Sequence, residues 1–473
     1  MHVLYTAAFE RGVLTTDARR KLYQVSRGSL CVHVPSPFEH LPMSATWPGP
    51  GACCRRSVGL LLTAILLAGL LSACTGPRGD EAIRVGVLHS LSGTMAFSER
   101  DVVDATLLAI EQINERGGVL GRRVEPVIRD GASDWDLFAS LAQELIVDES
   151  VAVVFGCWTS ASRKTVLPVF ERYDHLLFYP VQYEGLESSP NIVYTGAAPN
   201  QQIIPAVKWA MDNLGQRFFL VGSDYVFPRA ANRIMSDQIL SLRGQVLGES
   251  YVLLGSTDVD AAVAAIVDTR PDVILNTLNG DSNIAFFERL RAEGIMPNLI
   301  PTISFSIAEV ELQAMGSAAF VGDFAAWNYF QSVDTEENQA FVDAFQGRFG
   351  ADRVLTDPME AAFNGVHLWA AAAELAGSTA TAAVRTALAS LSLAAPHGPI
   401  SVDPTSQHLW KSVRIGRIRS DGQFDIVWET PKPVRPLPFP PYRSLQEWQL
   451  FLDDMQGGWG GQWANPGPAG AES

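Results

Sequence analysis

Residues 151–155 (VAVVF) lead directly into residues 156–164 (GCWTSASRK), and this junction indicates the architecture of the chain. A short run of apolar, mostly β-branched residues predicts a strand buried on both faces of a parallel sheet. The hydroxyl-rich turn that follows predicts a helix beginning near Ser160 and Ser162. In open α/β sheets, small ligands bind beyond the carboxyl ends of the strands, beside the free N–H groups of the next helix. The turn is therefore a candidate ligand site, and an N-cap followed by an ordinary helix is the alternative.

An alternation of strands and helices extends to both sides of this junction. In the first series, strands are expected at residues 83–88, 124–130 and 176–178, and helices at residues 101–116, from 134 and after 160. A second series begins after Pro199-Asn200. Its strands are expected at residues 218–221, 246–253, 273–276 and 299–303, and its helices at residues 202–214, 229–242, from 258 and 282–293. We predict an α/β fold with two doubly wound, parallel-sheet lobes.

The last third of the chain breaks this rhythm. Helices are expected at residues 338–349, 358–375 and 379–390, followed by a two-stranded hairpin, residues 413–418 and 424–428, around Asp421-Gly422. From Pro431 onward, Pro, Gly and Trp dominate. This composition predicts an extended tail on the surface, residues 431–473, that becomes disordered past about Gly457.

The N-terminal region carries the pattern of a secretory signal. Arg55-Arg56 precedes an apolar segment, residues 58–71, which ends in LSAC at residues 71–74. The segment is too short to span a bilayer, and its end resembles the lipobox of bacterial lipoproteins, which implies lipidation of Cys74. We therefore interpret residues 1–73 as a leader whose true start is Met43, and residues 74–81 as a lipid-anchor linker. The mature protein is then expected to be secreted and anchored to the outer face of the cytoplasmic membrane.

Charge and cysteine content exclude several classes of protein. The formal net charge is −16 and no basic run follows the leader, which argues against nucleic acid as a partner. Cys157 is the only cysteine after Cys74, so no disulfide framework is possible there. Cys157 lies beside the candidate site and could be a nucleophile, but a buried small apolar side chain is the favoured interpretation. About 400 residues remain after the leader, more than one core normally serves, which again predicts two lobes.

Several motifs at the predicted strand ends resemble one known family. They are VLHSLSGTM (87–95), GCWTSASRK (156–164), YPVQYEG (179–185), APNQQ (198–202) and GSDYVFPR (222–229). These motifs resemble the urea and short-chain-amide binding proteins, members of the type I periplasmic-binding-protein superfamily, like the leucine/isoleucine/valine receptor. Further matching stretches are TLNGDSN (277–283), AWNYF (326–330) and DPMEAA (357–362), and the likeness runs from about Ile83 to Pro433.

The resemblance implies two lobes that close on one small ligand by a hinge motion, joined by three crossings near Pro199, Trp327 and Gly398-Pro399. Lobe I would comprise residues 82–199 and 328–399, and lobe II residues 200–327 and 400–430. The resemblance also implies which strand-end side chains face the ligand. From lobe I these are Trp158, Ser160, Tyr179, Val181, Gln182 and Tyr183, and from lobe II they are Tyr225, Phe227, Asn279, Asp281 and Ser304.

Urea fits such a lining chemically. It is planar and neutral, with one carbonyl acceptor and four N–H bonds that all need acceptors when buried. The Ser160 hydroxyl and nearby N–H groups can serve the carbonyl, whereas oxygens of Asp281, Asn279 or Gln182 can accept the N–H donors. We therefore expect an extracytoplasmic protein that captures urea and delivers it to an ABC permease and ATPase, without a cofactor or a metal. A receptor for acetamide or formamide, for transport or for amide sensing, is the alternative.

Two further functions compete with transport. A secreted amidase or urease-like hydrolase needs catalytic groups, but the chain has no His-Glu-x-x-His and no Gly-x-Ser-x-Gly motif. The carboxylates of Glu184 and Glu309 could act as bases, but helix capping or ligand hydrogen bonding is favoured. A cytoplasmic amide sensor would use the same two lobes, and the secretory signal argues against it. The histidines after the leader are scattered without ligand spacing: His89, His175, His367, His397 and His408.

Overall fold

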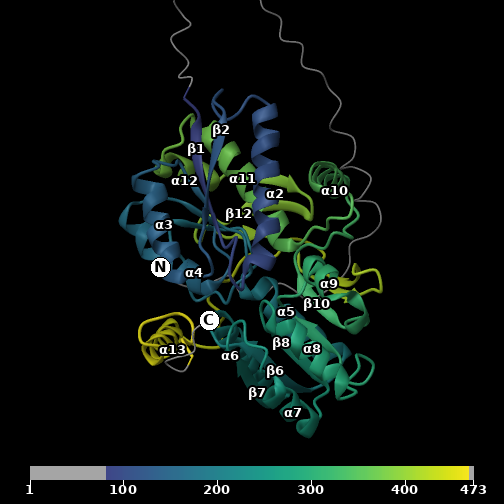
Figure 1. The fold of residues 1–473 in the computed structure, drawn as a ribbon. Helices are drawn as coiled ribbons and strands as arrows, with labels where there is room; N and C mark the ends of the chain where they lie inside the picture. Colours follow the sequence, from purple (N-terminus) through teal and green to yellow (C-terminus); the bar gives the residue numbers. More distant parts are fainter. Residues whose placement is uncertain (1–80, 468–473) are drawn as a thin grey trace, which may run out of the picture. The chain divides into compact units, whose positions relative to one another are not determined.

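The computed structural model describes residues 81–467 of the chain (Figure 1). The predicted leader with Met43, the predicted lipidation site Cys74 and the last six residues lie outside this range. Two sheets of mostly parallel strands, each with its own helices, confirm the predicted α/β fold with two lobes. Among the helices of residues 81–467, none combines the length and the hydropathy of a membrane span.

Lobe I is built on a five-stranded parallel sheet in the order β2-β1-β3-β4-β5. The strands are β1 (Ile83–His89), β2 (Val124–Asp130), β3 (Val154–Gly156), β4 (Leu177–Tyr179) and β5 (Ile192–Tyr194). Helices α2 (Ala96–Glu115) and α11 (Asp357–Ala376) pack together on one side of the sheet, and α3 (Trp135–Val147) and α4 (Ser160–Arg172) on the other (Figure 1). The sequence does not predict β5, because its three residues are too few to show an alternation.

Lobe II has a seven-stranded sheet in the order β15-β14-β10-β9-β8-β6-β7. Its parallel strands are β6 (Arg217–Ser223), β7 (Gln245–Val252), β8 (Val273–Thr277), β9 (Thr302–Ser304) and β10 (Phe324–Trp327). The predicted hairpin, β14 (Arg414–Ile418) and β15 (Phe424–Glu429), adds two antiparallel strands at one edge. The helices are α5 (Ile203–Asn213), α6 (Val226–Ser241), α7 (Asp260–Thr269), α8 (Ser282–Ala292), α9 (Glu309–Met315) and the 3-10 turn η2 (Ser317–Ala319). The short elements β10 and α9 are not predicted by the sequence.

The third crossing between the lobes lies later than predicted. Helices α10 (Glu336–Phe349) and α12 (Thr381–Leu388) flank α11, and a small antiparallel sheet follows, with β11 (Ser392–Ala395), β12 (Gly398–Val402) and β13 (Leu409–Trp410). Ile400, Val402 and Leu409 pack in the core of lobe I. The chain therefore leaves lobe I between β13 and β14, and not near Gly398-Pro399. These strands are short and rich in Ser, Gly and Pro, which hides their alternation in the sequence.

Asn328 joins the three crossings at one point. Its Nδ2 donates to the carbonyl of Gln201, in the 3-10 turn η1 (Pro199–Gln201) of the first crossing, at 2.9 Å, and to the carbonyl of Ser412 on the third at 2.7 Å. Asn328 itself follows β10 on the second crossing and is 0% exposed. The Asp357 carboxylate, at the start of α11, accepts the backbone N–H of Asn328 at 2.9 Å. One buried amide thus holds the three connections together.

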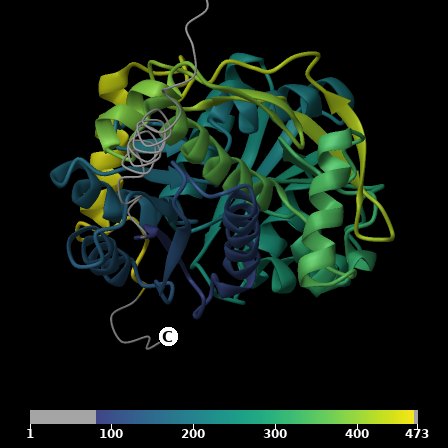
Figure 2. The ribbon, with the colours of Figure 1, turned by 90° about the horizontal axis from the view of Figure 1, so that it is seen from above.

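The C-terminal region contains a helix where an extended tail is predicted. Helix α13 (Leu445–Gly458) begins with a capping box formed by Ser444 and Glu447. Trp448 and Leu452 are buried in the core of lobe II, and regular structure continues past Gly457, where disorder is predicted. The prediction is wrong here because Pro and Gly on both sides obscure the helical spacing of the apolar residues. Figure 2 shows this yellow segment on the same side of the molecule as the blue helices of lobe I.

Candidate ligand-binding site

The turn between β3 and α4 is fixed by close contact with β1. A Cβ at Gly156 would lie 2.1 Å from the carbonyl oxygen of Leu88, so only glycine fits there. Cys157 follows with a φ of 64° and donates its N–H to the same carbonyl at 2.9 Å. Thr159 is the N-cap of α4, because its Oγ1 accepts the Ser162 N–H at 3.0 Å. The cap is therefore Thr159, and the hydroxyl of Ser160 has other partners.

Cys157 is a buried thiol. Its side chain is 0% exposed, and burial together with the nearby Glu99 carboxylate raises the pKa of the thiol far above its usual range. The Ser162 hydroxyl and the Arg163 guanidinium lower this pKa only in part. Because the nucleophilic form is the thiolate, the geometry supports the interpretation of Cys157 as a small apolar side chain.

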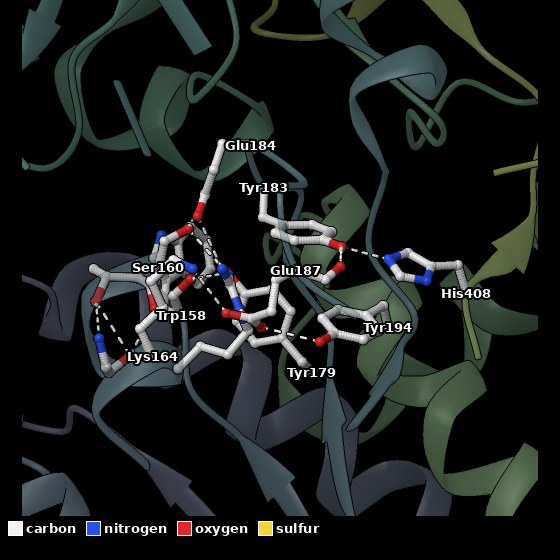
Figure 3. A network of polar contacts seen from close by, with 12 residues as sticks. Trp158, Ser160, Lys164, Tyr179, Tyr183, Glu184, Glu187, Tyr194 and His408 are labelled. Atoms are coloured by element: carbon white, nitrogen blue, oxygen red, sulfur yellow. Dashed lines mark hydrogen bonds and ion pairs between the residues drawn. The ribbon is translucent and has the colours of Figure 1, made fainter. Parts of the chain in front are cut away.

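A buried ion cluster adjoins this turn (Figure 3). It consists of Arg163 and Lys164 of α4 and of Glu184 and Glu187 from the loop after β4. Arg163 is 0% exposed, and it donates from Nη2 to Glu184 Oε1 at 3.0 Å and from Nε to Glu187 Oε1 at 2.8 Å. Lys164 Nζ donates to Glu187 Oε2 at 2.9 Å. Two cations face two carboxylates, so the formal charges of the cluster cancel.

Ser160 is bonded to the ion cluster. Its hydroxyl donates to Glu184 Oε2 and accepts from Arg163 Nη1, the latter at 3.0 Å. Burial raises the pKa of Glu187, but the charges of Arg163 and Lys164 outweigh this effect and bring that pKa to about 2. Glu187 therefore stays ionised at neutral pH. The one proton of the Ser160 hydroxyl is thus donated to Glu184, so in this structure Ser160 is not free to donate to a ligand carbonyl, contrary to the role expected from the sequence.

Tyrosine rings enclose the Arg163 guanidinium. The guanidinium carbon lies 4.8 Å from the ring centroid of Tyr179 and 4.4 Å from that of Tyr183. The Tyr179 hydroxyl donates to the carbonyl of Trp158 at 2.6 Å, which ties β4 to the candidate turn (Figure 3).

A stack of three rings continues from Tyr183 into lobe I. Tyr183 stacks on Tyr194 with a centroid distance of 5.1 Å, and Tyr194 stacks on His408 at 4.1 Å (Figure 3). The Tyr183 hydroxyl also bonds His408 Nε2. Burial lowers the pKa of His408 to about 4, so the imidazole is neutral near pH 7. Tyr183 is thus held inside lobe I by its ring face and by its hydroxyl.

The predicted aromatic residues of lobe II lie where β6 ends and α6 begins. Tyr225 is the N-cap residue of α6, and Tyr225 and Phe227 are both 2% exposed. Burial, followed by Tyr179 and Glu184 of lobe I, raises the pKa of the Tyr225 hydroxyl. Ala161 of lobe I packs in the same apolar cluster as Tyr225, so Tyr225 lies against lobe I. Asp281, by contrast, is exposed at the start of α8, apart from the buried set.

The predicted polar residues of lobe II are bonded within their own lobe. The Asn279 N–H donates to Ser223 Oγ at 2.9 Å, and its Nδ2 donates to the carbonyl of Thr277 at 3.1 Å. Ser304 Oγ accepts from Asn276 Nδ2 at 3.2 Å. Both side chains are buried at strand ends.

The two faces meet directly. Gln182 Nε2 of lobe I donates to the carbonyl of Phe305 of lobe II at 2.9 Å, and Ser98 Oγ donates to Glu311 Oε1 at 2.9 Å. Ala161 of lobe I packs in the apolar cluster of Tyr225 and Phe227. Ten of the eleven predicted site residues, Val181 included, are 5% exposed or less. The cleft between the lobes is therefore closed.

Within residues 81–467, no group of three or more His, Cys, Asp or Glu is arranged to hold a metal ion.

A family model agrees with this geometry of two lobes closing at their strand ends. The periplasmic binding protein domain matches residues 83–445, which include both lobes and every predicted site residue. The chain belongs to the periplasmic binding protein family. It is accordingly a solute-binding protein and not an enzyme, and membership of this family implies an extracytoplasmic location.

Relatives of this periplasmic binding protein have different named ligands. The Leu/Ile/Val-binding protein homolog 6 of Brucella melitensis biotype 1 is 24% identical over 366 residues, which cover 75% of this chain and 92% of that protein. A solute-binding protein of an ABC transporter from R. palustris, in complex with 4-hydroxybenzoate, is similar with a TM-score of 0.68 and 24% identity over 75% of this chain and 98% of that one. A branched-chain amino acid transporter substrate-binding protein from Streptococcus pneumoniae, in complex with isoleucine, has a TM-score of 0.65 and 18% identity over 75% and 100% of the two chains. At these identities the solved structures establish the fold alone.

In this periplasmic binding protein, polar atoms without partners mark three positions, of which Gln182 is a predicted site residue whereas Gln202 and Ser306 are not. The Oε1 atoms of Gln182 and Gln202 and the Oγ of Ser306 are buried and have no hydrogen-bond partner within residues 81–467. Gln182 and Gln202 both donate from Nε2 to the carbonyl of Phe305, at 2.9 and 3.2 Å. Two free amide oxygens and one free hydroxyl therefore gather around residues 305–306.

The loop after β1 and the first turn of α2 contribute further unpartnered atoms. Thr94 Oγ1 and Glu99 Oε1 are buried without a partner in the described part of the chain. Thr94 lies against lobe II, since a Cβ at Gly255 would be 2.9 Å from Thr94 Oγ1. Thr94 and Gln202 fall within two of the motifs that carry the family resemblance, and this position in a motif could have identified them as site residues from the sequence. Glu99 and Ser306 have no such signal, because only the fold brings them to the cleft.

Proposed function

We propose that this periplasmic binding protein binds urea between its lobes and delivers it to the permease and ATPase of an ABC transporter. The solute-binding role follows from the family, and relatives named above belong to such transporters. One observation carries the choice of urea: the charged side chains of the ion cluster are already paired, whereas the polar atoms left without partners at residues 182, 202 and 306 are neutral.

Paired charges favour a neutral ligand. The 4-hydroxybenzoate and isoleucine of the two structural relatives each carry a carboxylate, and burial of a carboxylate requires a cation or several N–H donors. Here Arg163 and Lys164 are bonded to Glu184 and Glu187. A carboxylate ligand at this face would have to displace one of these glutamates and leave it buried without a partner. Urea is neutral, so its burial does not require a cation to be released from the cluster.

The free oxygens favour a ligand with several N–H donors. Gln182 Oε1 and Gln202 Oε1 can each accept one, and Ser306 Oγ can accept or donate. Acetamide replaces one amino group of urea by a methyl group, and each acceptor orphaned in this way costs about 1–3 kcal/mol. The YPVQ stretch with Val181 also resembles urea receptors. A receptor for acetamide or formamide is the second candidate, because the family resemblance includes both classes.

Isothermal titration tests the proposal. We expect saturable binding of urea, at least about tenfold tighter than acetamide or formamide, in line with one orphaned acceptor. 4-Hydroxybenzoate and isoleucine should give no saturable heat. A Gln182→Leu variant should weaken urea binding, whereas Gln339→Leu, the same substitution on the exposed side of α10, should not. Equal affinities for acetamide and urea would contradict the choice of urea, and release of ammonia from urea by the purified protein would contradict a pure binding role.

We also propose that Cys74 carries the lipid that anchors the protein outside the cytoplasmic membrane. The proposal rests on the signal-like segment and the LSAC sequence before the described residues. A Cys74→Ala variant should appear in the soluble fraction. Unchanged retention in the membrane fraction would argue against this anchor.

A further inference from the structure

The C-terminal segment, residues 431–467, touches the hinge and both lobes. Val434 exchanges backbone hydrogen bonds with Lys411 on the third crossing, and Pro438 O accepts the Leu186 N–H of lobe I at 2.8 Å. Arg443 Nη2 then donates to Asp237 Oδ1 of α6 at 2.8 Å. In Figure 1, helix α13 lies beside α6 and below α4. The segment therefore starts at the hinge and ends beside the strand ends that form the candidate site.

The last part of this segment pairs with the ligand-site loop of lobe II. The Val226 N–H donates to the carbonyl of Trp463 at 3.0 Å, and the Asn465 N–H donates to the carbonyl of Asp224 at 3.0 Å. Asn465 Nδ2 also donates to Asp224 Oδ2 at 2.7 Å. These bonds flank Tyr225 on both sides. Residues 463–465 are thus fastened to lobe II at the residue proposed to face the ligand.

The same residues also reach lobe I, where the ring of Trp463 lies over Lys164. Lys164 Nζ lies 4.8 Å from the ring centroid of Trp463. Around this contact the surfaces separate into a cavity of about 690 Å³, lined from lobe I by Asp134, Trp135 and Thr165 and from the C-terminal segment by Gln456 and Gln462. Next to this cavity the segment contacts lobe I through a cation–π pair, whereas several hydrogen bonds attach it to lobe II.

We propose that residues 459–465 form a strap that stays on lobe II and holds the cleft closed through the contact of Trp463 with Lys164. Lys164 is bonded to Glu187, and Glu187 to Arg163, which bonds Ser160. The strap thus ends on the same ion cluster that orients the candidate turn. Opening the cleft separates Trp463 from Lys164, so the strap opposes opening and slows the release of a bound solute. The inference concerns the motion of the lobes and depends on the proposed function only for the identity of that solute.

Hydrogen exchange of the full chain without ligand tests the strap directly. In a Trp463→Leu variant, amides of residues 160–164 and 224–226 should exchange about threefold to tenfold faster, the range expected from losing one cation–π contact. Trp463→Phe, which keeps a ring over Lys164, should stay close to the wild type. Leu450→Ala, a 54% exposed position on α13, is the matched control and should change nothing.

The two measurements distinguish failure of the strap proposal from failure of the proposed function. If the wild type binds urea, stopped-flow release should accelerate in Trp463→Leu by the same factor as the exchange. If it does not, the proposed function fails, but the exchange of residues 160–164 still tests the strap. Unchanged exchange there in Trp463→Leu overturns the strap even when urea binds. Should that variant also loosen α13 itself, Asn465→Ala replaces it, and unchanged exchange in both segments then overturns the strap.

Discussion

The two faces of the ligand cleft are built from different chemistry. The lobe I face rests on the buried ion cluster, in which Arg163 and Lys164 face Glu184 and Glu187. The lobe II face rests on neutral groups, the rings of Tyr225 and Phe227 and amide and hydroxyl side chains bonded within the lobe. Lobe II also carries carboxylates near this face, Asp224 paired with Arg229 and Glu311 bonded to Ser98, but the fully buried guanidinium and its two carboxylates belong to lobe I.

This difference indicates that the two lobes contribute differently to stability and to ligand binding. Ionised groups hold their partners tightly but are costly to leave unpaired, so lobe I presents a rigid face whose shape depends on its charges. Neutral hydrogen bonds are individually weaker, so the loss of one of them from the lobe II face should cost less stability. We therefore expect substitutions in lobe I to affect stability and substitutions in lobe II to affect mainly ligand binding.

Breaking the ion cluster should have the largest effect. Replacing Arg163 by Met leaves the Glu184 carboxylate buried without its cation and Glu187 with Lys164 alone. We expect the free energy of unfolding to fall by about 3–5 kcal/mol. Guanidinium chloride denaturation measures this, and urea is avoided because it is the proposed ligand.

A second substitution sharpens the interpretation of that loss. Adding Glu184→Gln to Arg163→Met removes the unpaired charge and should recover part of the stability. If the double variant is no more stable than Arg163→Met alone, the loss reflects packing around the tyrosines and not the buried charge.

A fall in pH should have the second largest effect on the stability of lobe I. Burial holds the pKa of His408 at about 4, below the value of about 6.5 in an unfolded chain. The unfolded chain therefore takes up a proton between pH 6.5 and 4 that the folded chain does not, and stability falls across this window by up to about 3 kcal/mol. A His408→Phe variant keeps the ring stack and should show a flatter dependence of unfolding free energy on pH.

A second histidine of lobe I, His367, should contribute to the same pH dependence. Burial also lowers the pKa of His367 to about 4, and this residue remains in both proteins, so part of the pH dependence should persist. Identical slopes for the wild type and His408→Phe would show that His408 does not contribute to it.

A change on the lobe II face should have the smallest effect on stability. Tyr225→Phe removes one neutral hydroxyl and should lower the unfolding free energy by about 0.5–1.5 kcal/mol. Because Tyr225 faces lobe I, the variant should also bind urea about threefold to tenfold more weakly. Tyr251→Phe, which removes a hydroxyl bonded to Glu249 on the lobe II surface, should leave urea binding unchanged. If Tyr225→Phe costs as much stability as Arg163→Met, the two faces do not differ in the way described here.

The sequence predicts the strands whose apolar runs are long enough to show a period. Residues 124–130 form β2 as expected, and the hairpin around Asp421-Gly422 is confirmed. The short elements β5, β11 and β13 show no readable pattern, whereas the equally short β3 and β4 are predicted because apolar runs mark them. Residues 400–409 consequently go to lobe I, against the prediction.

The loops of the candidate site are predictable, whereas the direction of each side chain is not. The sequence predicts that Ser160 lies near the start of a helix, but its partners Glu184 and Arg163 depend on how β4 is placed beside β3. The contact between Tyr183 and His408 joins residues 225 positions apart. No local period carries such information, and the resemblance to a family supplies the loops without their hydrogen bonds.

The amide of Asn328 limits how the two lobes can move. It bonds to main-chain carbonyls of the first and third crossings, so the junction does not depend on which side chains occupy positions 201 and 412. The three connections are therefore held to one another where they cross, through hydrogen bonds of a single residue. If the lobes close by a hinge motion, as the family resemblance implies, we expect the backbone beside Asn328 to be the part that turns.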